Sequence, residues 1–569
     1  MKKLLPLASL TLIILGAYTY YARTPLPTPP TPKSATLSGV VVPHHDLVAS
    51  FRSEFFNTVS THISPPDTII LVSPNHYSTG RGRIQTTDKS WTVLNGTVEP
   101  NKKIVRALID NSIATDEPIS FTDEHGIYNI LKDIHAYFPN ARIVPIILKQ
   151  LSEDSLDTLH QKLLDTCADC LLIASVDFSH YQPALLADIH DARTLRFLQN
   201  LDIRNLLTEA EVDSGSSLAL LARWAQSHDT HKFVPWKQTN SGAIYNDPDM
   251  ETTTHIFGWY EQGEKTVPTS SVSFTIAGDT LFARYIGSTF GNNMRDAFAL
   301  LGDRVFWGTD ARILNLEGSI TTQPITEQLD PNSTVFTFPP SIISALSYIR
   351  INSVSQANNH SDNAGAEGID TTRRTLASAG IQTCGGPWSN DIPRVAYFKG
   401  EGLTLALVCI NLTYPGQNPE SALSTISSLA QDETMRILVM PHWGVEYATK
   451  HSPAQERAAH MWIDAGADMV IGAHPHVIQD TELYRGAPII YSLGNFLFDQ
   501  VDPATKTGLI VSGTFTENAL SWFALPVVSD RFAPRLLVGE QKRKILDTLY
   551  APFTKTSTTF GDTINIIKE

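Results

Sequence analysis

Apolar runs of strand length alternate with helix-like segments along most of this 569-residue chain. Runs such as residues 68–74 (TIILVSP) and 436–441 (RILVMP) are short and continuously apolar, which is typical of buried strands. Longer segments, such as residues 364–380 and 454–466, mix apolar and polar residues in a pattern that fits helices. The alternation of the two patterns predicts an α/β fold.

The predicted strands fall into two groups on either side of a polar, Pro-containing linker at residues 261–270. The strands of the first group are residues 39–43, 68–74, 142–148 and 171–176. The strands of the second group are residues 272–278, 312–317, 351–356, 403–410, 436–441 and 467–473. We therefore expect one domain over residues 39–260 and a second over residues 271–527, followed by a C-terminal extension over residues 528–569.

The N-terminus carries Lys2 and Lys3, followed by an uncharged apolar run over residues 4–22. As a helix, this run would span roughly 28 Å, which is enough for one pass through a bilayer. Small residues are poorly placed for signal-peptide cleavage, so we favour an uncleaved anchor, with a cleaved signal as the alternative. We predict a transmembrane signal-anchor over residues 1–23 and a Pro/Thr-rich linker over residues 24–38. Because the lysines hold the short end in the cytoplasm, the bulk of the chain should be extracytoplasmic at the cell membrane.

Composition narrows the classes of function. The chain has 43 Lys and Arg against 58 Asp and Glu, a net charge of −15, and no basic stripe, which argues against nucleic acid as a partner. Four cysteines are too few for a disulfide framework. Cys167 and Cys170 fit packing or one local disulfide, and Cys384 and Cys409 are expected to be buried thiols.

In the second group, polar residues with metal-binding chemistry follow five of the strands. Ligands of open α/β sheets lie outside the carboxyl ends of strands, where the connecting loops converge. Each residue alone reads as a turn, a helix cap or a packing side chain, but five such endings together favour a shared site. Carboxylates, amides and imidazoles suit Mn²⁺, Zn²⁺ or Fe²⁺, and a pair of ions can hold both oxygens of a phosphoryl transfer. The residues are Asp279, Glu317, Asn358, Asn359, His360, His442, His474 and His476.

Six motifs of this half resemble the CapA (PGA_cap) family of capsule-synthesis proteins. They are GDTLFAR (278–284), NLEGSIT (315–321), ANNHSDNAG (357–365), HWGVEY (442–447), GADMVIGAHPHVIQ (466–479) and YSLGNFLFD (491–499). The resemblance implies a role in poly-γ-glutamate capsule production. It also implies a calcineurin-like metallophosphatase fold, with helices flanking a β-sandwich. Carried over by position, it implies one or two metal ions held by Asp279, Glu317, Asn359, His442, His474 and His476.

The same resemblance makes Asp279, His442 and His360 the catalytic residues, with His360 beside the leaving group. One position departs from the family pattern. Metallophosphatases commonly have Asp-x-His at the first motif, whereas this chain has Leu281 two residues after Asp279. One ligand of the first ion is therefore missing, so we expect a single ion or a weakened pair.

The first group of strands also ends in histidines and carboxylates, which would suit a mononuclear Fe²⁺ or Zn²⁺ but singly fit helix caps and polar pocket residues. The motifs VPHHDL, SPNH, DEHGIYNIL and ASVDFSHYQ resemble the Memo-like proteins, called AmmeMemoRadiSam system protein B in bacteria. This resemblance implies a fold shared with class III extradiol dioxygenases. Where that family often has Cys-Gly, this chain has Ser214-Gly215, so at most a weak single metal is expected. The pocket residues identified in this way are His44, His76, Glu124, His125, Asp177 and His180.

Together these features predict a membrane-anchored CapA-family protein for capsule, poly-γ-glutamate or exopolymer synthesis, with a metal-dependent, phosphoesterase-like hydrolase site. Its expected partners are the membrane and a surface polymer or its synthesis machinery. One alternative is a noncatalytic polymer-binding or assembly scaffold, and another is metal or redox chemistry in the Memo-like half. Trp443, Tyr447 and Tyr491 adjoin the predicted ligands and fit either a polymer-binding wall or core packing.

Overall fold

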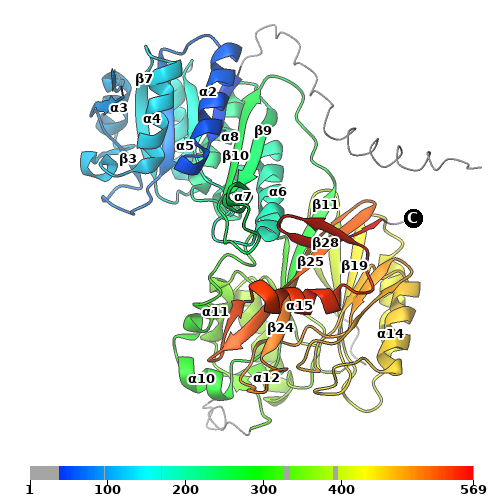
Figure 1. Ribbon diagram of the computed structural model, residues 1–569. Coiled ribbons are helices and arrows are strands. Elements are labelled where there is room, and N and C mark those ends of the chain that lie inside the picture. The colour runs from blue at the N-terminus through cyan, green and yellow to red at the C-terminus, as the bar shows by residue number, and fades with distance from the viewer. Residues whose placement is uncertain (1–36, 95, 168, 324–332, 389–394, 568–569) are drawn as a thin grey trace, which may run out of the picture.

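The computed structural model describes residues 37–94, 96–167, 169–323, 333–388 and 395–567 (Figure 1). Among these residues, no helix has the length and apolar character needed to cross a membrane. The predicted anchor over residues 1–23 and most of the predicted linker over residues 24–38 lie outside the described residues.

The first half of the chain is built on one sheet of eight strands. These strands are β1 (Leu37–Val42), β2 (Thr68–Pro74), β3 (Ile84–Thr86), β6 (Thr115–Asp116), β7 (Arg142–Leu148), β8 (Leu171–Ser175), β9 (Lys232–Asn240) and β10 (Thr254–Glu261). Their order is β6-β3-β7-β2-β8-β1-β10-β9, and the central strands β7, β2, β8 and β1 run parallel. A separate hairpin consists of β4 (Trp91–Val93) and β5 (Gly96–Val98).

Helices cover both faces of this sheet (Figure 1). One face is covered by α2 (Ala49–His62) and α4 (His125–Tyr137). The helices packed on the other face are α3 (Lys102–Asp110), α5 (Glu153–Thr166), α6 (Ala184–Asn200), α7 (Ile203–Thr208) and α8 (Gly215–Ser227). The short α9 (Ser241–Tyr245) follows β9. The parallel central strands thus direct their carboxyl ends, and the loops that follow them, to one edge of the sheet.

The second half contains a sheet of ten strands and a sheet of six. The larger sheet consists of β11 (Ser271–Thr280), β12 (Ala311–Leu316), β15 (Ser353–Ser355), β16 (Gln382–Cys384), β23 (Asn495–Leu497), β24 (Thr507–Thr516), β25 (Ala519–Asp530), β26 (Ala533–Leu536), β27 (Lys555–Thr558) and β28 (Gly561–Ile567). The smaller consists of β17 (Val395–Lys399), β18 (Thr404–Asn411), β19 (Met435–His442), β20 (Met469–Ile471), β21 (Thr481–Tyr484) and β22 (Ala487–Ile490). A small parallel pair is formed by β13 (Ser319–Ile320) and β14 (Thr337–Phe338).

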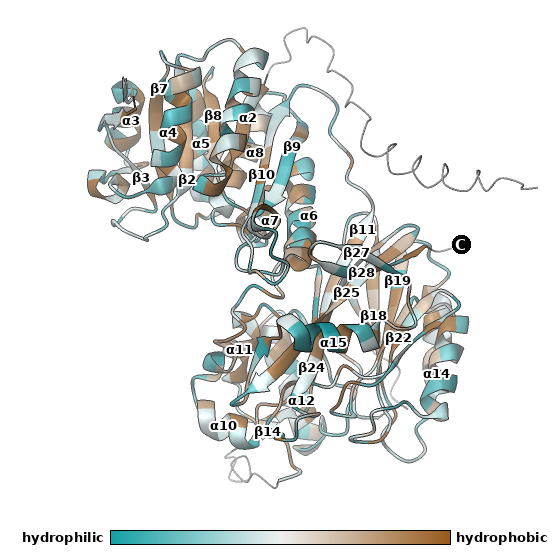
Figure 2. Ribbon diagram, in the orientation of Figure 1, coloured by the Kyte–Doolittle hydropathy of each residue, from teal (hydrophilic) through white to brown (hydrophobic). Residues whose placement is uncertain are grey.

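The two sheets pack face to face and helices cover their outer faces. Apolar residues of β11 and β12 share one core with residues of β18, β19 and β20. The outer face of the larger sheet packs against α10 (Arg284–Phe290), α11 (Ile342–Tyr348) and α12 (Gly365–Ser378). The outer face of the smaller sheet packs against α13 (Leu423–Leu429) and α14 (Pro453–Asp464). Figure 2 shows hydrophobic residues concentrated in the strands, and the predicted α/β fold is confirmed.

Residues beyond Val527, which the sequence suggested as an extension, form part of the larger sheet and its core. After β26, the chain forms α15 (Gly539–Leu549) and the hairpin of β27 and β28, and β28 pairs antiparallel with β25. The rings of Tyr550 and Phe553 pack edge-on against Trp522, with ring centroids 5.6 and 5.3 Å away. These residues therefore help to close the apolar core between the two sheets.

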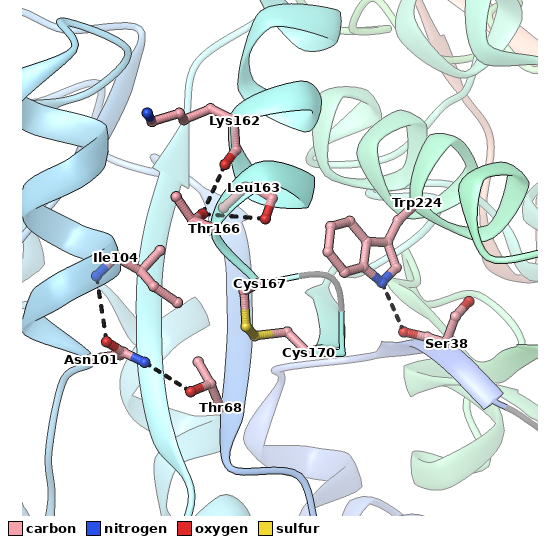
Figure 3. The surroundings of a disulfide bond; sticks show 10 residues. All are labelled: Ser38, Thr68, Asn101, Ile104, Lys162, Leu163, Thr166, Cys167, Cys170 and Trp224. Carbon is pink, nitrogen blue, oxygen red and sulfur yellow. Dashed lines mark hydrogen bonds between the residues drawn. A yellow bond between two sulfur atoms is a disulfide. The ribbon is translucent and has the colours of Figure 1, made fainter.

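Two disulfides join the four cysteines. The Cys167–Cys170 bond closes the turn between α5 and β8 (Figure 3), in line with the local-disulfide interpretation. The expectation of free thiols at Cys384 and Cys409 is wrong, because these residues form a disulfide with their Cα atoms 5.5 Å apart. Cys384 ends β16 in the larger sheet and Cys409 lies in β18 of the smaller sheet, so their pairing depends on how the two sheets pack.

Charged residues join the two halves. On α6, Arg193 Nε and Arg196 Nη2 donate to Asp310 Oδ1 at 2.9 and 2.5 Å. Arg304, from the second half, pairs with the fully buried carboxylate of Glu211 in the first half. Glu211 lies in the loop between α7 and α8, so the second half contacts a loop of the first half directly.

Candidate metal centres

The carboxyl ends of β11 and β19 and the loops after β12 and β20 bring several predicted ligands together. Asp279 Oδ2 lies 3.1 Å from His476 Nδ1, and Glu317 Oε2 lies 4.0 Å from His476 Nε2. Ligand atoms of these three buried residues all lie within 4.8 Å of one another. His442 Nε2 lies 3.9 Å from Glu317 Oε1 and 2.8 Å from the Oδ1 atom of Asn359. The cluster therefore combines two carboxylates, an amide oxygen and two imidazoles in one buried volume.

His474 lies at the side of this cluster. Its ring centroid is 4.7 Å from that of His442 and 6.1 Å from that of His476. Its backbone N–H donates to Asp279 Oδ2 at 3.2 Å. His474 and His476 have φ angles of 99° and 60°, in the left-handed region that is unfavourable for residues with a side chain. Backbone strain of this kind persists where the surrounding structure imposes it, and it is common at functional sites.

Asn315 is a central residue of the cluster that the sequence reasoning missed. Its side-chain amide donates to Asp279 Oδ1 at 2.8 Å and to Glu317 Oε1 at 3.1 Å. Its Oδ1 atom accepts a hydrogen bond from Asn358 Nδ2 at 3.1 Å, and the side chain is fully buried. The available signal was its position in β12, two residues before Glu317 and therefore on the same side of the strand.

The buried carboxylates and imidazoles of the cluster shift one another's pKa values. Burial alone would raise the pKa of Asp279, but the hydrogen bond from His476 and the neighbouring imidazoles lower it below its usual range. Glu317 behaves in the opposite way, because burial and then the charge of Asp279 raise its pKa well above the usual range. Burial and the charge of His476 lower the pKa of His474 to about 4. His474 is therefore neutral near pH 7, whereas its surroundings favour the protonated form of Glu317.

Two buried ligand atoms of the cluster have no hydrogen-bond partner among the described residues, namely Glu317 Oε2 and His474 Nδ1. Unsatisfied buried polar atoms are costly, and a divalent cation would bond to such atoms and allow both carboxylates to ionise. The residues present therefore fit a metal ion. Leu281, which stands where a phosphatase histidine is common, is fully buried in the core beneath α10 and supplies no ligand.

His360 lies beside the cluster rather than within it. Its Nε2 atom is 3.1 Å from Asn359 Nδ2, and its Nδ1 atom is 3.0 Å from Asn363 Oδ1. The ring stacks on Phe336 with centroids 3.8 Å apart. Burial is the main cause that lowers the pKa of His360 to about 4. The imidazole is therefore neutral at pH 7, with Nδ1 as the donor to Asn363 and Nε2 as the acceptor.

The three aromatic residues beside the cluster divide into two kinds. Trp443 and Tyr491 are 2% and 0% exposed and stack on one another with ring centroids 6.0 Å apart, so core packing is the correct interpretation for both. Tyr447 is 54% exposed and lies 6.3 Å from the ring of His476. Of the three, only Tyr447 is available to contact a polymer.

In the first half, three histidines converge where β1, β2 and α4 meet. The ring centroids of His76 and His125 are 4.0 Å apart, and those of His44 and His76 are 4.8 Å apart. Ligand atoms of the three residues all lie within 4.8 Å of one another. Glu124 is fully buried and its Oε1 atom lies 2.5 Å from His76 Nδ1. Glu124 thus orients His76 and is not itself in the group of ligand atoms.

A second ligand group in this pocket contains a residue that the sequence reasoning missed. His44 Nε2 lies 3.3 Å from Asp177 Oδ2 and 3.2 Å from Asp213 Oδ2. The signal for Asp213 was its place directly before Ser214-Gly215, the motif in which the Memo-like family often has a cysteine. The pocket is therefore richer in carboxylates than the sequence indicated.

His180 is placed differently from the other predicted pocket residues. Its backbone N–H donates to Glu211 Oε1 at 3.2 Å, and none of the ligand groups in the described residues includes it. Burial lowers the pKa of His180, although the charges of Asp213 and Asp177 oppose this effect. His180 thus lies near the pocket, toward the contact with the second half.

Two family models match the chain, one in each half. Residues 273–500 match the family described as bacterial capsule synthesis protein PGA_cap, and residues 20–216 match the family described as Memo-like protein. The chain is therefore a fusion of a Memo-like region with a CapA-type PGA_cap region. The cluster around Asp279 lies in the PGA_cap region, and the pocket around His44 lies in the Memo-like region.

Relatives with curated names match each region. The PGA biosynthesis protein CapA of Bacillus subtilis (strain 168) is 27% identical over 306 residues, which cover 50% of this chain and 80% of the relative. The capsule biosynthesis protein CapA of Bacillus anthracis is 34% identical over 179 residues, covering 28% of this chain and 44% of the relative. A MEMO1 family protein of Caldivirga maquilingensis is 28% identical over 178 residues, covering 30% of this chain and 62% of the relative.

Among solved structures, purple acid phosphatase PPD1 of yellow lupin (Lupinus luteus) aligns with 59% of this chain and 69% of its own. The TM-score is 0.25 at 9% sequence identity, which is too low to support an argument.

Proposed function

We propose that this protein acts in the synthesis of a capsule or exopolymer, such as poly-γ-glutamate, through a metal-dependent hydrolytic site in its PGA_cap region. The names of the two CapA relatives support the process, and the PGA_cap family model covers the region that carries the site. The observation that carries the hydrolytic part is the convergence of Asp279, Glu317 and His476 around a buried carboxylate oxygen without a hydrogen-bond partner among the described residues. Such a donor set suits one or two Mn, Zn or Fe ions.

When bound, the metal would act as a Lewis acid that polarises the bond to be cleaved and activates the attacking water. The residues that would hold it are Asp279, Glu317, Asn359, His442, His474 and His476. Asn315 keeps the two carboxylates in place through its two donated hydrogen bonds. The same proposal includes a calcineurin-like metallophosphatase fold for this region. The two packed sheets of the region direct the carboxyl ends of several strands to one site, as such a fold requires.

His360 is the proposed proton carrier beside the leaving group. Its Nδ1 atom donates to Asn363, so Nε2, which lies 3.1 Å from Asn359 Nδ2, is the atom that would exchange a proton with the substrate in place of this contact. Because its pKa is about 4, protonation requires a nearby negative charge, which an anionic substrate would supply. Arg284 lies over the ring of Phe336, which stacks on His360, although its guanidinium is paired with the buried carboxylate of Asp499. Phosphoesters and γ-glutamyl chains are both anionic.

The proposed location is the outer side of the cell membrane, with residues 4–22 as the anchor and the polymer-synthesis machinery as the partner. A related protein from Mycobacterium tuberculosis, 28% identical over 215 residues, is named a probable polyglutamine synthesis accessory protein. The word accessory supports a role for this chain alongside other proteins of the polymer-synthesis machinery. The apolar length of residues 4–22 supports the anchor.

One observation favours a second candidate function, a noncatalytic scaffold for polymer or assembly. Leu281 is buried in the core at the position where phosphatases commonly carry a metal-ligating histidine. The cluster therefore lacks one ligand of a complete two-metal site.

The test is the metal content and hydrolytic activity of three variants of the purified chain. In His474→Ala/His476→Ala, two imidazoles are lost and the bound metal of the PGA_cap site should disappear. In His360→Ala, the metal should remain while turnover falls by roughly 10²- to 10⁴-fold, because only proton transfer is affected. His451→Ala is the matched control, because His451 binds Asp480 away from the cluster.

Unchanged metal content in the double variant would refute the ligand assignment. If the metal-loaded protein is inactive on every phosphoester, γ-glutamyl and glycan polymer tested, the scaffold function replaces the hydrolase.

A further inference from the structure

A pair of aromatic side chains lies beside the PGA_cap cluster and is open to solvent. The chain has nine tryptophans, all within the described residues, and Trp388 is the only one of them that is exposed, at 49%. Its indole stacks on the ring of Tyr414, with ring centroids 4.9 Å apart and 28° between the planes. Because Tyr414 covers one face of the indole, the exposed surface of Trp388 lies on the opposite face and the edges.

Tyr414 connects this pair to the metal-ligand cluster. Its hydroxyl lies 3.0 Å from the backbone carbonyl of Asn359 and 3.0 Å from Asp362 Oδ1. The side-chain Oδ1 atom of Asn359 lies 2.8 Å from His442 Nε2 within the cluster, and the next residue in the chain is His360. The aromatic pair therefore lies on the His360 side of the cluster, where the leaving group of the proposed reaction is expected.

The two segments that carry these rings are held together. The disulfide joins Cys384, shortly before the indole in the chain, to Cys409, shortly before the phenol ring. Asn411 Nδ2 donates to the backbone carbonyl of Pro387 at 2.8 Å, which joins the same two segments a second time. An aromatic surface that is already fixed in place loses little conformational entropy when it binds a ligand.

The chemistry of this surface fits a sugar ring better than a γ-glutamyl chain. The face of an indole carries partial negative charge and attracts the C–H groups on the apolar face of a pyranose. A γ-glutamyl chain has no ring and carries a carboxylate on every unit, which the nearby carboxylate of Asp362 would repel. Sugar hydroxyls, in contrast, are donors that a carboxylate oxygen accepts well.

We infer that Trp388 and Tyr414 form a stacking platform for a sugar ring, so that the substrate of the PGA_cap site is a phosphoester whose leaving group is a sugar. This inference deepens the proposed function and rests on it. The phosphate binds at the metal-ligand cluster and the sugar stacks on Trp388. Hydrolysis breaks the P–O bond to the sugar, transfers the oxygen of water to phosphorus and leaves a proton on the sugar oxygen, next to His360.

The test is the binding of phosphate esters to the full chain loaded with Mn²⁺, measured by calorimetry. All proteins carry His360→Ala, which should keep the metal and slow turnover. The probes are glucose 1-phosphate and N-acetylglucosamine 1-phosphate, glycerol 1-phosphate, which lacks a ring, and uridine 5′-phosphate, which adds a base. We expect at least one sugar phosphate to bind roughly fivefold or more tightly than glycerol 1-phosphate.

Substitution of the indole separates the ring contact from the phosphate contact. Trp388→Ala should weaken binding of the sugar phosphate by roughly five- to hundredfold and leave the Kd of glycerol 1-phosphate unchanged, because only the stacked ring is lost. Trp388→Phe keeps an aromatic face and should restore part of the affinity. The matched control is Tyr245→Ala, which removes a 62% exposed aromatic side chain on α9 in the first half of the chain.

Three results would overturn the inference: equal affinity of the parent for the sugar and glycerol phosphates, an unchanged Kd in Trp388→Ala, or no binding of either sugar phosphate. Tighter binding of uridine 5′-phosphate that depends on Trp388 would assign the platform to a base instead. Circular dichroism shows whether each variant folds. If Trp388→Ala does not fold, Trp388→Leu, which keeps apolar bulk without a flat face, is judged by the same change in Kd.

The proposed hydrolytic site can fail separately from the platform. If the sugar phosphate binds in a Trp388-dependent way but equally well to His474→Ala/His476→Ala, the platform is correct and the metal-ligand cluster does not hold the phosphate. If glycerol 1-phosphate binds only to the metal-loaded protein and no sugar phosphate binds more tightly, the phosphoester site is correct and the platform is wrong.

Discussion

Asn315 shows how one uncharged side chain can organise two carboxylates. Its amide donates to both Asp279 and Glu317, which are buried next to each other. A donor at this place offsets part of the repulsion between the carboxylates and leaves their remaining oxygens directed toward the imidazoles.

Replacing this donor should therefore destabilise the metal-free protein. In Asn315→Asp, a third carboxylate faces the other two, and we expect the free energy of unfolding to fall by roughly 1–3 kcal/mol. The measurement is urea denaturation of the chelator-treated protein. Asn565→Asp, an exposed change on β28, is the control and should have little effect. Equal stability of the Asn315 variant and the parent would mean that the amide does not hold the carboxylates.

Two buried histidines of the PGA_cap site predict how stability depends on pH. Burial lowers the pKa of both His360 and His474 to about 4, whereas histidine in an unfolded chain titrates near 6.5. Between these values the unfolded chain binds protons that the native protein does not. The stabilising contribution of the neutral rings is therefore complete above pH 6.5 and is lost as the pH falls toward 4.

We expect the free energy of unfolding of the chelated protein to decrease over this pH window, by up to about 3 kcal/mol per histidine. His360→Gln and His474→Gln should each reduce the slope. Urea denaturation at a series of pH values measures it, and a slope that neither substitution changes would show that other groups cause the acid sensitivity.

At the level of elements, the Cys384–Cys409 bond ties an edge strand of the larger sheet, β16, to β18 in the smaller sheet. The bond closes a loop with a sequence separation of 25 residues. A cross-link of this span limits the unfolded chain much more than the three-residue separation of Cys167–Cys170 does.

Removal of the longer cross-link should therefore cost more stability. We expect Cys384→Ala/Cys409→Ala to lower the free energy of unfolding by roughly 3 kcal/mol, and Cys167→Ala/Cys170→Ala by less. Guanidinium denaturation without reductant compares the two. A larger loss from the Cys167–Cys170 pair would contradict the loop-length argument.

Across the whole molecule, acidic residues of one loop connect the two regions. Glu209 accepts from Arg312 Nη1 at 3.0 Å, and Glu211 pairs with Arg304, so both acids bind arginines of the PGA_cap region. Two residues further on, Asp213 lies in the Memo-like pocket. The same loop thus carries both the contact between regions and a pocket carboxylate.

Breaking this contact should affect stability and the Memo-like pocket together. In Arg304→Met, the fully buried carboxylate of Glu211 loses a charged partner, which should cost about 3 kcal/mol. The shift of the loop should also weaken metal binding near Asp213. Urea denaturation and calorimetry measure the two effects, and Arg304→Met/Glu211→Gln should recover part of the stability. Full metal affinity in Arg304→Met would show that the regions do not influence each other.

The proposed location of the chain has its own test. A reporter enzyme that is active only outside the cytoplasm, fused after Glu569, should be active, because residues 4–22 are expected to carry the bulk of the chain across the membrane. Replacing apolar residues of this run by charged ones should release the protein from the membrane fraction. Activity of a cytoplasm-only reporter at the same position would contradict this topology.

The amino-acid sequence by itself determined most of the parallel strands of the three large sheets. β2 and β7 begin and end at the predicted residues, 68–74 and 142–148, because a strand buried on both faces is a continuous apolar run that polar residues terminate. The same rule placed Asp279 and His442 at strand ends, and the structure brings these two residues to one site.

Only the tertiary structure decided which of the many polar residues meet. Asp213, Asn315 and the Cys384–Cys409 pair have neighbours that are distant in sequence, and no local pattern encodes which strand or loop will lie beside them. The contact of Arg304 with Glu211 likewise exists only once both regions are folded against each other. The local pattern of apolar and polar residues determines where helices and strands form. Which charged residues and thiols become neighbours is decided when these helices and strands bury their apolar faces against each other.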